Sequence, residues 1–273
     1  MNDNFNFRRF LTYFKYDITQ MWRNHSRAAI LIGGAGAIFY ILWVMFSLVF
    51  TQQWQTPTLP ARFAMFLFAF AVLELYQVRT YGHLTDKKAG SSWLMIPASK
   101  TEKFVSMLLV SLVVVPLLFL AVYAVLDGFL SLVDPTYGKA LFTSFLGTYS
   151  DVLDAFANMR GTYAIHLSPA TIIITTLAGF FCNFMYFLLC GICFKRNKLV
   201  CAFAIMFAFS TVLSLIMGFI MPGMLSNLNG VDVSEEMVLG WTQGIINFSV
   251  ILSILMTIGF GWGIWYRIKT LQH

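Results

Sequence analysis

Residues 105–132 read VSMLLVSLVVVPLLFLAVYAVLDGFLSL, an apolar stretch in which Asp127 is the one charged residue. A transmembrane helix needs about 20 predominantly apolar residues, so this stretch is long enough to cross a bilayer. Pro116 lies near its middle, and we expect the proline to kink the helix or to let it tilt. The stretch therefore predicts a membrane-spanning helix.

Five other stretches have a similar character, and the composition agrees with them. Of the 273 residues, 59% are hydrophobic and 11% are charged, whereas a soluble domain is about 25% charged. This composition excludes an ordinary soluble enzyme, a disordered chain and a disulfide scaffold, and it predicts an all-α, polytopic membrane protein. The six expected transmembrane helices are 28–50, 61–78, 105–132, 170–194, 199–222 and 241–266.

The lysines and arginines indicate how these helices are oriented. Fifteen of the 18 lie in the N-terminal segment, in alternate connections and in the C-terminal tail, and the other three are Arg62, Lys139 and Arg160. Because cytoplasmic loops carry an excess of Lys and Arg, this distribution requires an even number of crossings. We expect both termini to be cytoplasmic (N-in/C-in) and the chain to lie in a bacterial cytoplasmic (inner) membrane.

The segments outside the spans define the expected domain organisation. Residues 1–27 are expected to form a cytoplasmic amphipathic helix, and residues 28–273 the six-helix transmembrane domain. That domain includes a cytoplasmic coupling loop at 79–104 and an external connection at 133–168, within which 151–159 is expected to form a short amphipathic helix.

The N-terminal segment 4–25 carries apolar and basic residues at helical spacing. A helix of this kind lies in the membrane interface with its bases toward lipid phosphates. Two roles stay open: an anchor without further function, and a lever between a cytoplasmic partner and the first span. The expected apolar face consists of Phe7, Phe10, Leu11, Phe14, Ile18, Met21 and Trp22.

The cytoplasmic loop contains an apolar run, WLMI at 93–96, between charged residues. An exposed apolar patch bordered by charge is typical of a docking site for a partner, but Trp is also common where a chain folds back onto the membrane interface. Both interpretations stay open. Ser99 and Glu102 match a capping box, so we expect a helix to begin at this point.

Motifs that carry chemistry are absent from the sequence. There is no G-x-x-x-x-G-K-[ST] phosphate loop, so the chain is not expected to bind and hydrolyse ATP alone. No pattern indicates a catalytic residue, a metal site or nucleic-acid binding, and the four cysteines are expected to pack as small apolar residues. The two carboxylates placed within the spans, Glu74 and Asp127, lie near span ends, which argues against a proton-coupled pump.

Small and aromatic residues mark two further features of the spans. Ala29, Gly33 and Ala37 are spaced for close helix contact, which we interpret as packing within one bundle. A row of apolar side chains on one side of the second span is expected to line a substrate path together with Glu74. The residues of this row are Phe63, Phe66, Phe70 and Leu73.

Two stretches resemble the membrane subunits of type-2 ABC exporters. The first is FNFRRFLTYFKYDITQMWRN at 5–24, and the second is KKAGSSWLMIPASKTEKFVSMLLVS at 87–111. In that family the loop after the second span often carries two leucines and a proline, then a serine and a charged capping turn. Residues 94–102, LMIPASKTE, match this order, and the six-span layout is similar as well.

The resemblance implies a permease subunit that works with a separate ATPase. Two permease protomers, identical or different, would face each other, with substrate passing between them along the second and fifth spans. A cytoplasmic ABC ATPase subunit would bind ATP and Mg²⁺, and this chain, in contact with membrane lipids, would not be an enzyme. The chain departs from many relatives in its short connection between the fifth and sixth spans. By the resemblance, the ATPase-coupling surface comprises Lys87, Lys88, Ser91, Trp93, Pro97, Ser99 and Glu102.

Two other functions stay open at this point. A non-transporting membrane scaffold or assembly factor would have the same spans. A membrane-embedded enzyme acting on lipid would need polar residues that converge near one interface, for example Glu74, His83 and Asp86. For a transporter, the aromatic-rich path favours an apolar or amphipathic substrate.

Overall fold

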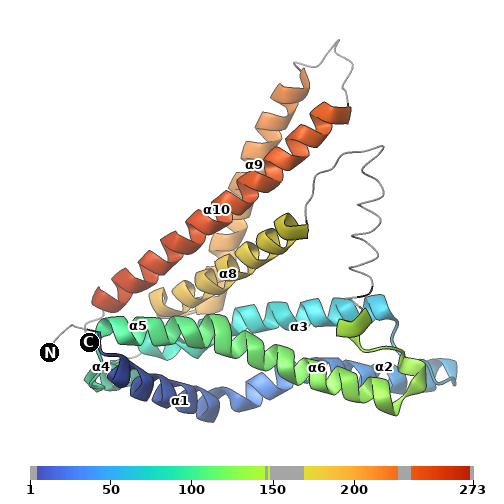
Figure 1. The fold of residues 1–273 in the computed structure, drawn as a ribbon, viewed down its shortest axis with the longest axis horizontal. Helices are drawn as coiled ribbons and strands as arrows, with labels where there is room; N and C mark the ends of the chain where they lie inside the picture. The colour runs from blue at the N-terminus through green and yellow to red at the C-terminus, as the bar shows by residue number, and fades with distance from the viewer. Residues whose placement is uncertain (1–4, 86, 145–146, 148–168, 227–234, 271–273) are drawn as a thin grey trace.

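The computed structural model of the chain confirms the expected all-α fold (Figure 1). It describes residues 5–85, 87–144, 147, 169–226 and 235–270, and within these ranges it contains no strand. The expected helix at 151–159 lies outside the described residues. The described helices are α1 (Phe7–Gly33), α2 (Ala35–Thr51), α3 (Leu59–Thr80), the 3₁₀ turn η1 (Gly82–Thr85), α4 (Lys87–Met95), α5 (Lys100–Leu109), the π-helical turn η2 (Val110–Val114), α6 (Val115–Val133), the 3₁₀ turn η3 (Pro135–Tyr137), α8 (Pro169–Cys193), α9 (Lys198–Ser226) and α10 (Glu235–Thr270).

Five helical units are long and apolar enough to cross a membrane. They are α3 with η1, the continuous unit α5–η2–α6, α8, α9 and α10. A sixth is present if α1 and α2, which meet at an angle of 44°, together form one span. The structure therefore supports five to six membrane-spanning helices, and the N-in/C-in orientation stays a prediction.

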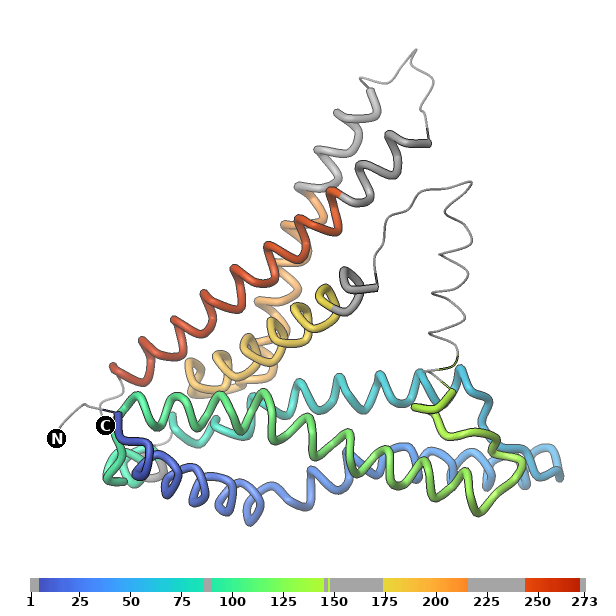
Figure 2. Tube along the Cα trace, viewed as in Figure 1, coloured from blue at the N-terminus to red at the C-terminus, as the bar shows by residue number. Residues whose placement is uncertain are grey.

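The helices share two ends, as the tube in Figure 2 shows. At the end that we call the near end, α1, α5 and α9 begin and α3, α8 and α10 end. At the opposite, far end, α2 and α6 end and α3 begins. Helices α1, α2, α3, α5 and α6 form one group, from which α9 and α10 lean away, and α8 packs against both α3 and α10.

Helix α1 is longer than the expected amphipathic segment and packs on other helices of the chain. It runs without a break to Gly33, so the bend lies at Gly34, within the predicted first span. The residues that it buries are Phe10, Tyr13, Asp17 and Met21, which recur every three or four positions. Three members of the expected apolar face, Phe7, Leu11 and Trp22, are exposed. The face that packs on the protein is therefore rotated from the one expected.

Glycines permit the closest helix crossings. A Cβ added at Gly33 would lie 2.8 Å from Cγ1 of Val122 in α6, and one at Gly36 would lie 2.8 Å from the ring of Tyr123. One member of the predicted small-residue ladder, Gly33, thus packs closely against another helix of the chain. A third crossing was not foreseen: a Cβ at Gly191 of α8 would lie 2.5 Å from the carbonyl oxygen of Val78 in α3.

Pro116 alters its helix without ending it. The π-helical turn Val110–Val114 comes directly before α6, in which Pro116 is the second residue. A proline cannot donate a backbone hydrogen bond to the carbonyl four residues earlier. A π turn changes the hydrogen-bond pattern locally within a continuous helix, and the span Lys100–Val133 stays one unit.

A buried ion pair joins α3 and α6 at the far end. Nη2 of Arg62 donates to Oδ1 of Asp127 at 2.8 Å, and each side chain is only 4% exposed. The same carboxylate accepts from the hydroxyl of Tyr137 at 2.8 Å and from the backbone N–H of Leu141 at 2.5 Å. The Arg62 guanidinium also lies 3.7 Å from the centroid of the Tyr137 ring. Asp127 therefore has a structural role.

A second carboxylate, Asp134, fastens α2 to the same end. It accepts hydrogen bonds from the hydroxyls of Thr136 at 2.6 Å and Tyr40 at 2.7 Å, and from the indole N–H of Trp54 at 3.3 Å. The hydrogen bonds, that from the Thr136 hydroxyl first, lower the pKa of Asp134 to about 2. The group is therefore an ionised acceptor at neutral pH.

The Gly191 crossing predicts a specific packing defect. We expect Gly191→Ala to destabilise the protein by roughly 1–3 kcal/mol, because the added Cβ meets a backbone carbonyl that cannot rotate away. Gly179→Ala in the same helix is the matched control, since a Cβ there has no atom within 4 Å. Thermal unfolding of both variants in detergent measures the difference. Equal melting temperatures would contradict this account of the crossing.

The far-end ion pair predicts that a single substitution destabilises the protein more than the removal of both charges does. We expect Asp127→Ala to cost roughly 3–5 kcal/mol of stability, because it leaves the Arg62 charge buried without a partner. The double variant Arg62→Met/Asp127→Leu removes both charges and should lose much less. Chemical unfolding of the detergent-solubilised protein, followed by tryptophan fluorescence, distinguishes the two. A double variant as unstable as the single one would show that the charge is not the cause.

Candidate functional site

The near end brings together the two stretches that carry the family resemblance. The start of α1, the short helix α4 and the start of α5 are linked there by hydrogen bonds of polar side chains, most of them buried. We call this group the near-end cluster. Its members are Asn6, Arg9, Tyr13, Asp17, Tyr81, Trp93, Ser99, Glu102, Lys103 and Ser106.

Glu102 is the centre of this cluster, and its side chain is fully buried. The predicted capping box is confirmed: the backbone N–H of Glu102 donates to Oγ of Ser99 at 3.2 Å, and the backbone N–H of Ser99 donates to the Glu102 carboxylate at 2.9 Å. The carboxylate also accepts from the backbone N–H of Asn6 at 2.8 Å and from Nε and Nη2 of Arg9, both at 2.8 Å. One carboxylate thus caps α5 and holds the start of α1.

Asp17 makes a second connection from α1. Its Oδ2 accepts hydrogen bonds from the hydroxyl of Ser106 in α5 at 2.6 Å and from the hydroxyl of Tyr81, which follows α3, at 2.9 Å. All three side chains are buried. Because burial without partners would cost several kcal/mol for a carboxylate, these two donors fix the position of α1 against α3 and α5.

Trp93 and Lys103 hold α4 against the same helices. The indole N–H of Trp93 donates to the hydroxyl of Tyr13 at 3.0 Å. Nζ of Lys103 donates to the carbonyl of Trp93 at 2.8 Å and to that of Leu94 at 3.3 Å, and lies 4.7 Å from the Trp93 ring centroid. A cation at the last carbonyls of a helix satisfies acceptors that have no partner within the helix.

The turn after α4 is where this cluster reaches the surface. Met95 is 82% exposed, Pro97 is exposed and Ile96 is half-buried. We call residues 95–97 the α4 tip. Beside it, Nζ of Lys100 donates to the carbonyl of Lys269 at the end of α10, at 3.2 Å. The α4 tip is therefore an exposed apolar turn, and hydrogen bonds link the residues around it to α1, α5 and α10.

These positions change the interpretation of the expected coupling surface. Trp93 is only 6% exposed, so the prediction of an exposed tryptophan was wrong for this residue, because Tyr13 and Lys103 draw it inward. Ser99 and Glu102 are also buried, Pro97 is exposed and Ser91 is half-buried. Lys87 and Lys88 belong to α4, of which the structure describes only the backbone at these two positions.

The residues of the expected substrate path lie mostly in the core. Phe66 and Phe70 pack against Phe119 with ring centroids 5.9 and 6.0 Å apart, and Leu73 is 2% exposed. Phe63 reaches the surface, and Glu74 is half-buried, with the Asn183 amide of α8 as a hydrogen-bond partner. Their role in transport stays a prediction.

A cavity of about 340 Å³ lies between α8, α9 and α10, and sequence reasoning did not find it. Its wall is largely apolar, with Ile205, Met206 and Phe209 on α9, and it includes the polar groups of Asn183 and Ser253. Single polar residues among apolar ones in three separate helices give no local signal, so only the arrangement of the helices reveals it.

The structure describes two of the three residues named for a lipid-modifying enzyme, Glu74 and His83. Glu74 lies in α3, and His83 lies nine positions further along the chain in η1, so the two do not share a turn of helix. His83 lies 3.2 Å from the carbonyl of Thr80, and Asp86 lies outside the described residues. In the described part of the chain, no group of three His, Cys, Asp or Glu side chains is arranged to hold a metal ion.

No protein-family model, curated protein or solved structure matches this chain. The function is therefore inferred from the near-end cluster and from the sequence.

The near-end cluster predicts that Glu102→Gln loosens α1. The amide cannot form the ion pair with Arg9, so we expect the start of α1 to be held less tightly against α5. Limited trypsin digestion should then cut faster after Arg8 and Arg9. Glu74→Gln is the matched control, because Glu74 lies in α3 and has no contact with the start of α1 among those described above. Unchanged cleavage in Glu102→Gln would contradict the proposed link.

Proposed function

We propose that this chain is the transmembrane permease subunit of an ATP-driven ABC exporter. It would move an apolar or amphipathic substrate across the cytoplasmic membrane, while a separate ATPase subunit binds ATP and Mg²⁺. The observation that carries the proposal is the near-end cluster. It joins residues 5–24 and 87–111, the two stretches that resemble type-2 ABC permeases, through Glu102 and Trp93.

The contacts of this cluster supply a route for mechanical coupling. A force on the α4 tip would pass through Trp93 to Tyr13 of α1, and through Lys103 to α5. Buried hydrogen bonds are directional, and those to Lys103 and Glu102 are charge-assisted, so the three helices would move together. Because α5 continues into α6 as one unit, the movement would reach the far end.

The proposal divides the expected coupling residues into two groups. Pro97, Ser91 and the lysines Lys87 and Lys88 would contact the ATPase, together with Met95 of the apolar run at 93–96. Trp93, Ser99 and Glu102 would act as positioning residues, because they are buried and hold the α4 tip on its support.

A second permease protomer completes the proposed assembly. The substrate would pass between protomers, in contact with α3 and α9. Long runs of exposed apolar side chains on these helices, such as Leu67 and Phe68 on α3 and Phe207 on α9, are compatible with contact to lipid or to another protomer.

The proposal predicts that the α4 tip lies against the ATPase. The photo-crosslinking amino acid p-benzoylphenylalanine in place of Met95 should form an adduct with a co-purified phosphate-loop ATPase that a neighbouring gene encodes. The same amino acid in place of Leu132, which is 86% exposed at the far end, is the control and should form none.

The outcomes separate the proposal from its rivals. Absence of any co-purifying ATPase and of nucleotide-dependent transport in vesicles would falsify it. An ATPase that cross-links at position 95 but shows no transport in any reconstitution would instead favour the non-transporting scaffold.

A further inference from the structure

The cavity of about 340 Å³ between α8, α9 and α10 is lined by residues that all lie within candidate membrane spans. These residues extend along α9 from Ile205 to Leu213 and along α10 from Ser249 to Phe260. The two stretches correspond to about 12 and 17 Å along the helix axes. The cavity therefore runs along the helices, and its volume is within the range of about 300–1,000 Å³ that is typical of small-molecule sites.

The walls of this cavity on α9 and α10 are largely apolar. The Ser249 hydroxyl donates to the carbonyl of Ile246 in its own helix at 2.8 Å, so it is already paired. On the α8 side the cavity is lined by Asn183, which is exposed. An apolar wall with an amide on one side favours an amphipathic ligand.

Asn183 connects the cavity to Glu74 of α3, with which it forms a hydrogen bond. Glu74 lies within the candidate span Leu59–Thr85 and is half-buried. The two ion pairs in the described part of the chain, one at each end of the helix group, do not include this carboxylate. Within a span, an ionisable side chain commonly marks a substrate or ion pathway.

The helices beside Glu74 and the cavity offer no cation to compensate this carboxylate. Helix α8 contains no charged residue, and neither do the stretches of α9 and α10 that line the cavity. Arg79, the nearest cation along α3, is five positions further on, which rotates it by about 140° around the helix. An ionised carboxylate without a partner is costly in an apolar environment. A ligand with a positive charge would remove this cost.

Aromatic rings near Asn183 also suit a cation. Tyr186 follows Asn183 by three positions on α8, and its ring packs against that of Phe260 on α10 with centroids 5.5 Å apart. Phe209 of α9 lines the cavity as well. Aromatic rings attract ammonium groups electrostatically and are used by proteins to bind quaternary ammonium ligands.

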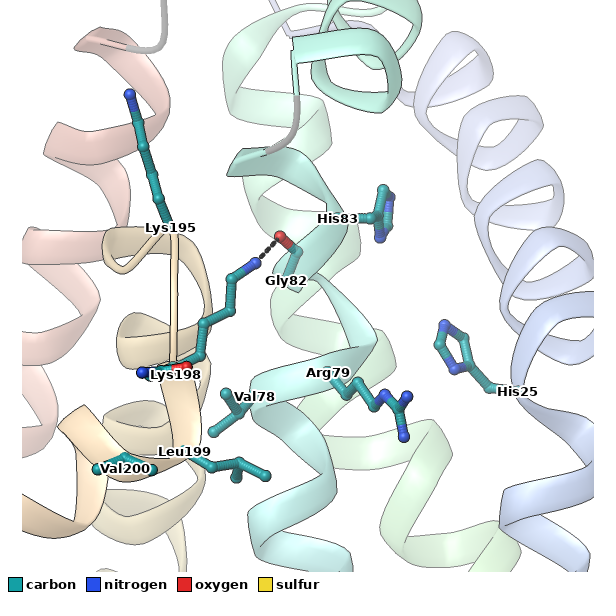
Figure 3. Close-up of a pocket in the computed structure, with 10 residues that line it drawn as sticks. His25, Val78, Arg79, Gly82, His83, Lys195, Lys198, Leu199 and Val200 are labelled. Atoms are coloured by element: carbon teal, nitrogen blue, oxygen red, sulfur yellow. Dashed lines mark hydrogen bonds between the residues drawn. The ribbon is translucent and has the colours of Figure 1, made fainter.

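Two other cavities of the described structure carry positive charge. One at the near end, of about 560 Å³, is lined by Arg79, Lys195 and Lys198 (Figure 3). One at the far end, of about 420 Å³, is lined by Arg62 and Lys139. Neither would attract a cation. Binding of a hydrophobic cation would therefore report on the cavity between α8, α9 and α10.

We propose that this cavity binds an amphipathic cation, with an ammonium group near Glu74 and Asn183 and an aliphatic chain between α9 and α10. An anionic or purely apolar molecule would leave the carboxylate uncompensated. Naming this ligand as the class of transported substrate rests on the proposed function, whereas its binding to the chain does not.

The test measures binding to the purified full chain, without an ATPase, in a neutral detergent and a slightly alkaline buffer. The probes are tritiated decyltrimethylammonium and decyl sulfate, which have the same chain and opposite charges. We expect the cation to bind more tightly, and Glu74→Gln to weaken its binding by roughly fivefold or more, because the amide has no charge. Glu74→Asp keeps the charge and should retain the affinity within about threefold. Equal affinities for the two probes would overturn the cation assignment.

A second pair of variants tests the position of the site. Ser253→Phe places a ring in the cavity and should abolish saturable binding of decyltrimethylammonium. Ser210→Phe is the matched control, because Ser210 is exposed on α9 and does not line the cavity. Thermal unfolding shows whether both variants are folded, and the Glu74 variants test the site independently of added volume. Equal binding by the two folded phenylalanine variants would overturn the site.

The site and the transport function can fail separately. Nucleotide-dependent transport with a co-purified ATPase, but without any preference for the cation, would overturn the site and leave the proposed function in place. Preference for the cation that Glu74→Gln removes would support the site even if no ATPase were found.

Discussion

The buried carboxylate of Glu102 sets the main constraint on the near end. A charge removed from water is tolerated only when donors surround it, and here the donors come from two separate places: the Ser99 cap, and the start of α1 through the Asn6 backbone N–H and the Arg9 guanidinium. Moving α1 away from α5 would leave this carboxylate without its ion pair. The position of α1 therefore follows from the hydrogen-bond requirement of one side chain.

Polar pairs at both ends give the helix group a specificity that apolar contacts alone would lack. Lipid chains are as apolar as leucine, so burial of apolar side chains between helices does not by itself favour one arrangement in a membrane. The Arg9–Glu102 pair joins α1 to α5 at the near end, and the Arg62–Asp127 pair joins α3 to α6 at the far end. Between them, aromatic side chains such as Phe66, Phe119 and Phe184 fill the middle. The ends thus link particular helices to each other, and the middle supplies contact area.

The features that depend on local pattern could be predicted from the sequence. Hydrophobic length located the spans to within a few residues, except for the α1–α2 bend, and the spacing of Ser99 and Glu102 identified a capping box that the structure confirms. The partners of these residues could not be predicted in the same way. Arg9 is 93 positions from Glu102, and Arg62 is 65 positions from Asp127. No periodicity connects such positions.

Trp93 and Asp17 show the same limit at a finer scale. Local sequence placed Trp93 in an exposed patch and left Asp17 off the expected apolar face, whereas both are buried by hydrogen bonds to distant residues. Amphipathic periodicity indicates which face of a helix is polar. It does not indicate whether the polar side chains on that face have hydrogen-bond partners inside the protein. In a chain with few charges, a polar residue on such a face is therefore a candidate for a buried contact as much as for solvent.

The continuity of α1 gives the proposed coupling its geometry. The helix has 27 residues without a break, which corresponds to about 40 Å of length. Its first turn is bound to Glu102, and its last residue, Gly33, lies against Val122 of α6. A helix held at both ends transmits a displacement along its axis, and the 44° bend at Gly34 is the first point where the chain changes direction. A movement of the near-end cluster would therefore act on the contact between Gly33 and α6, where a glycine leaves no side chain to absorb it.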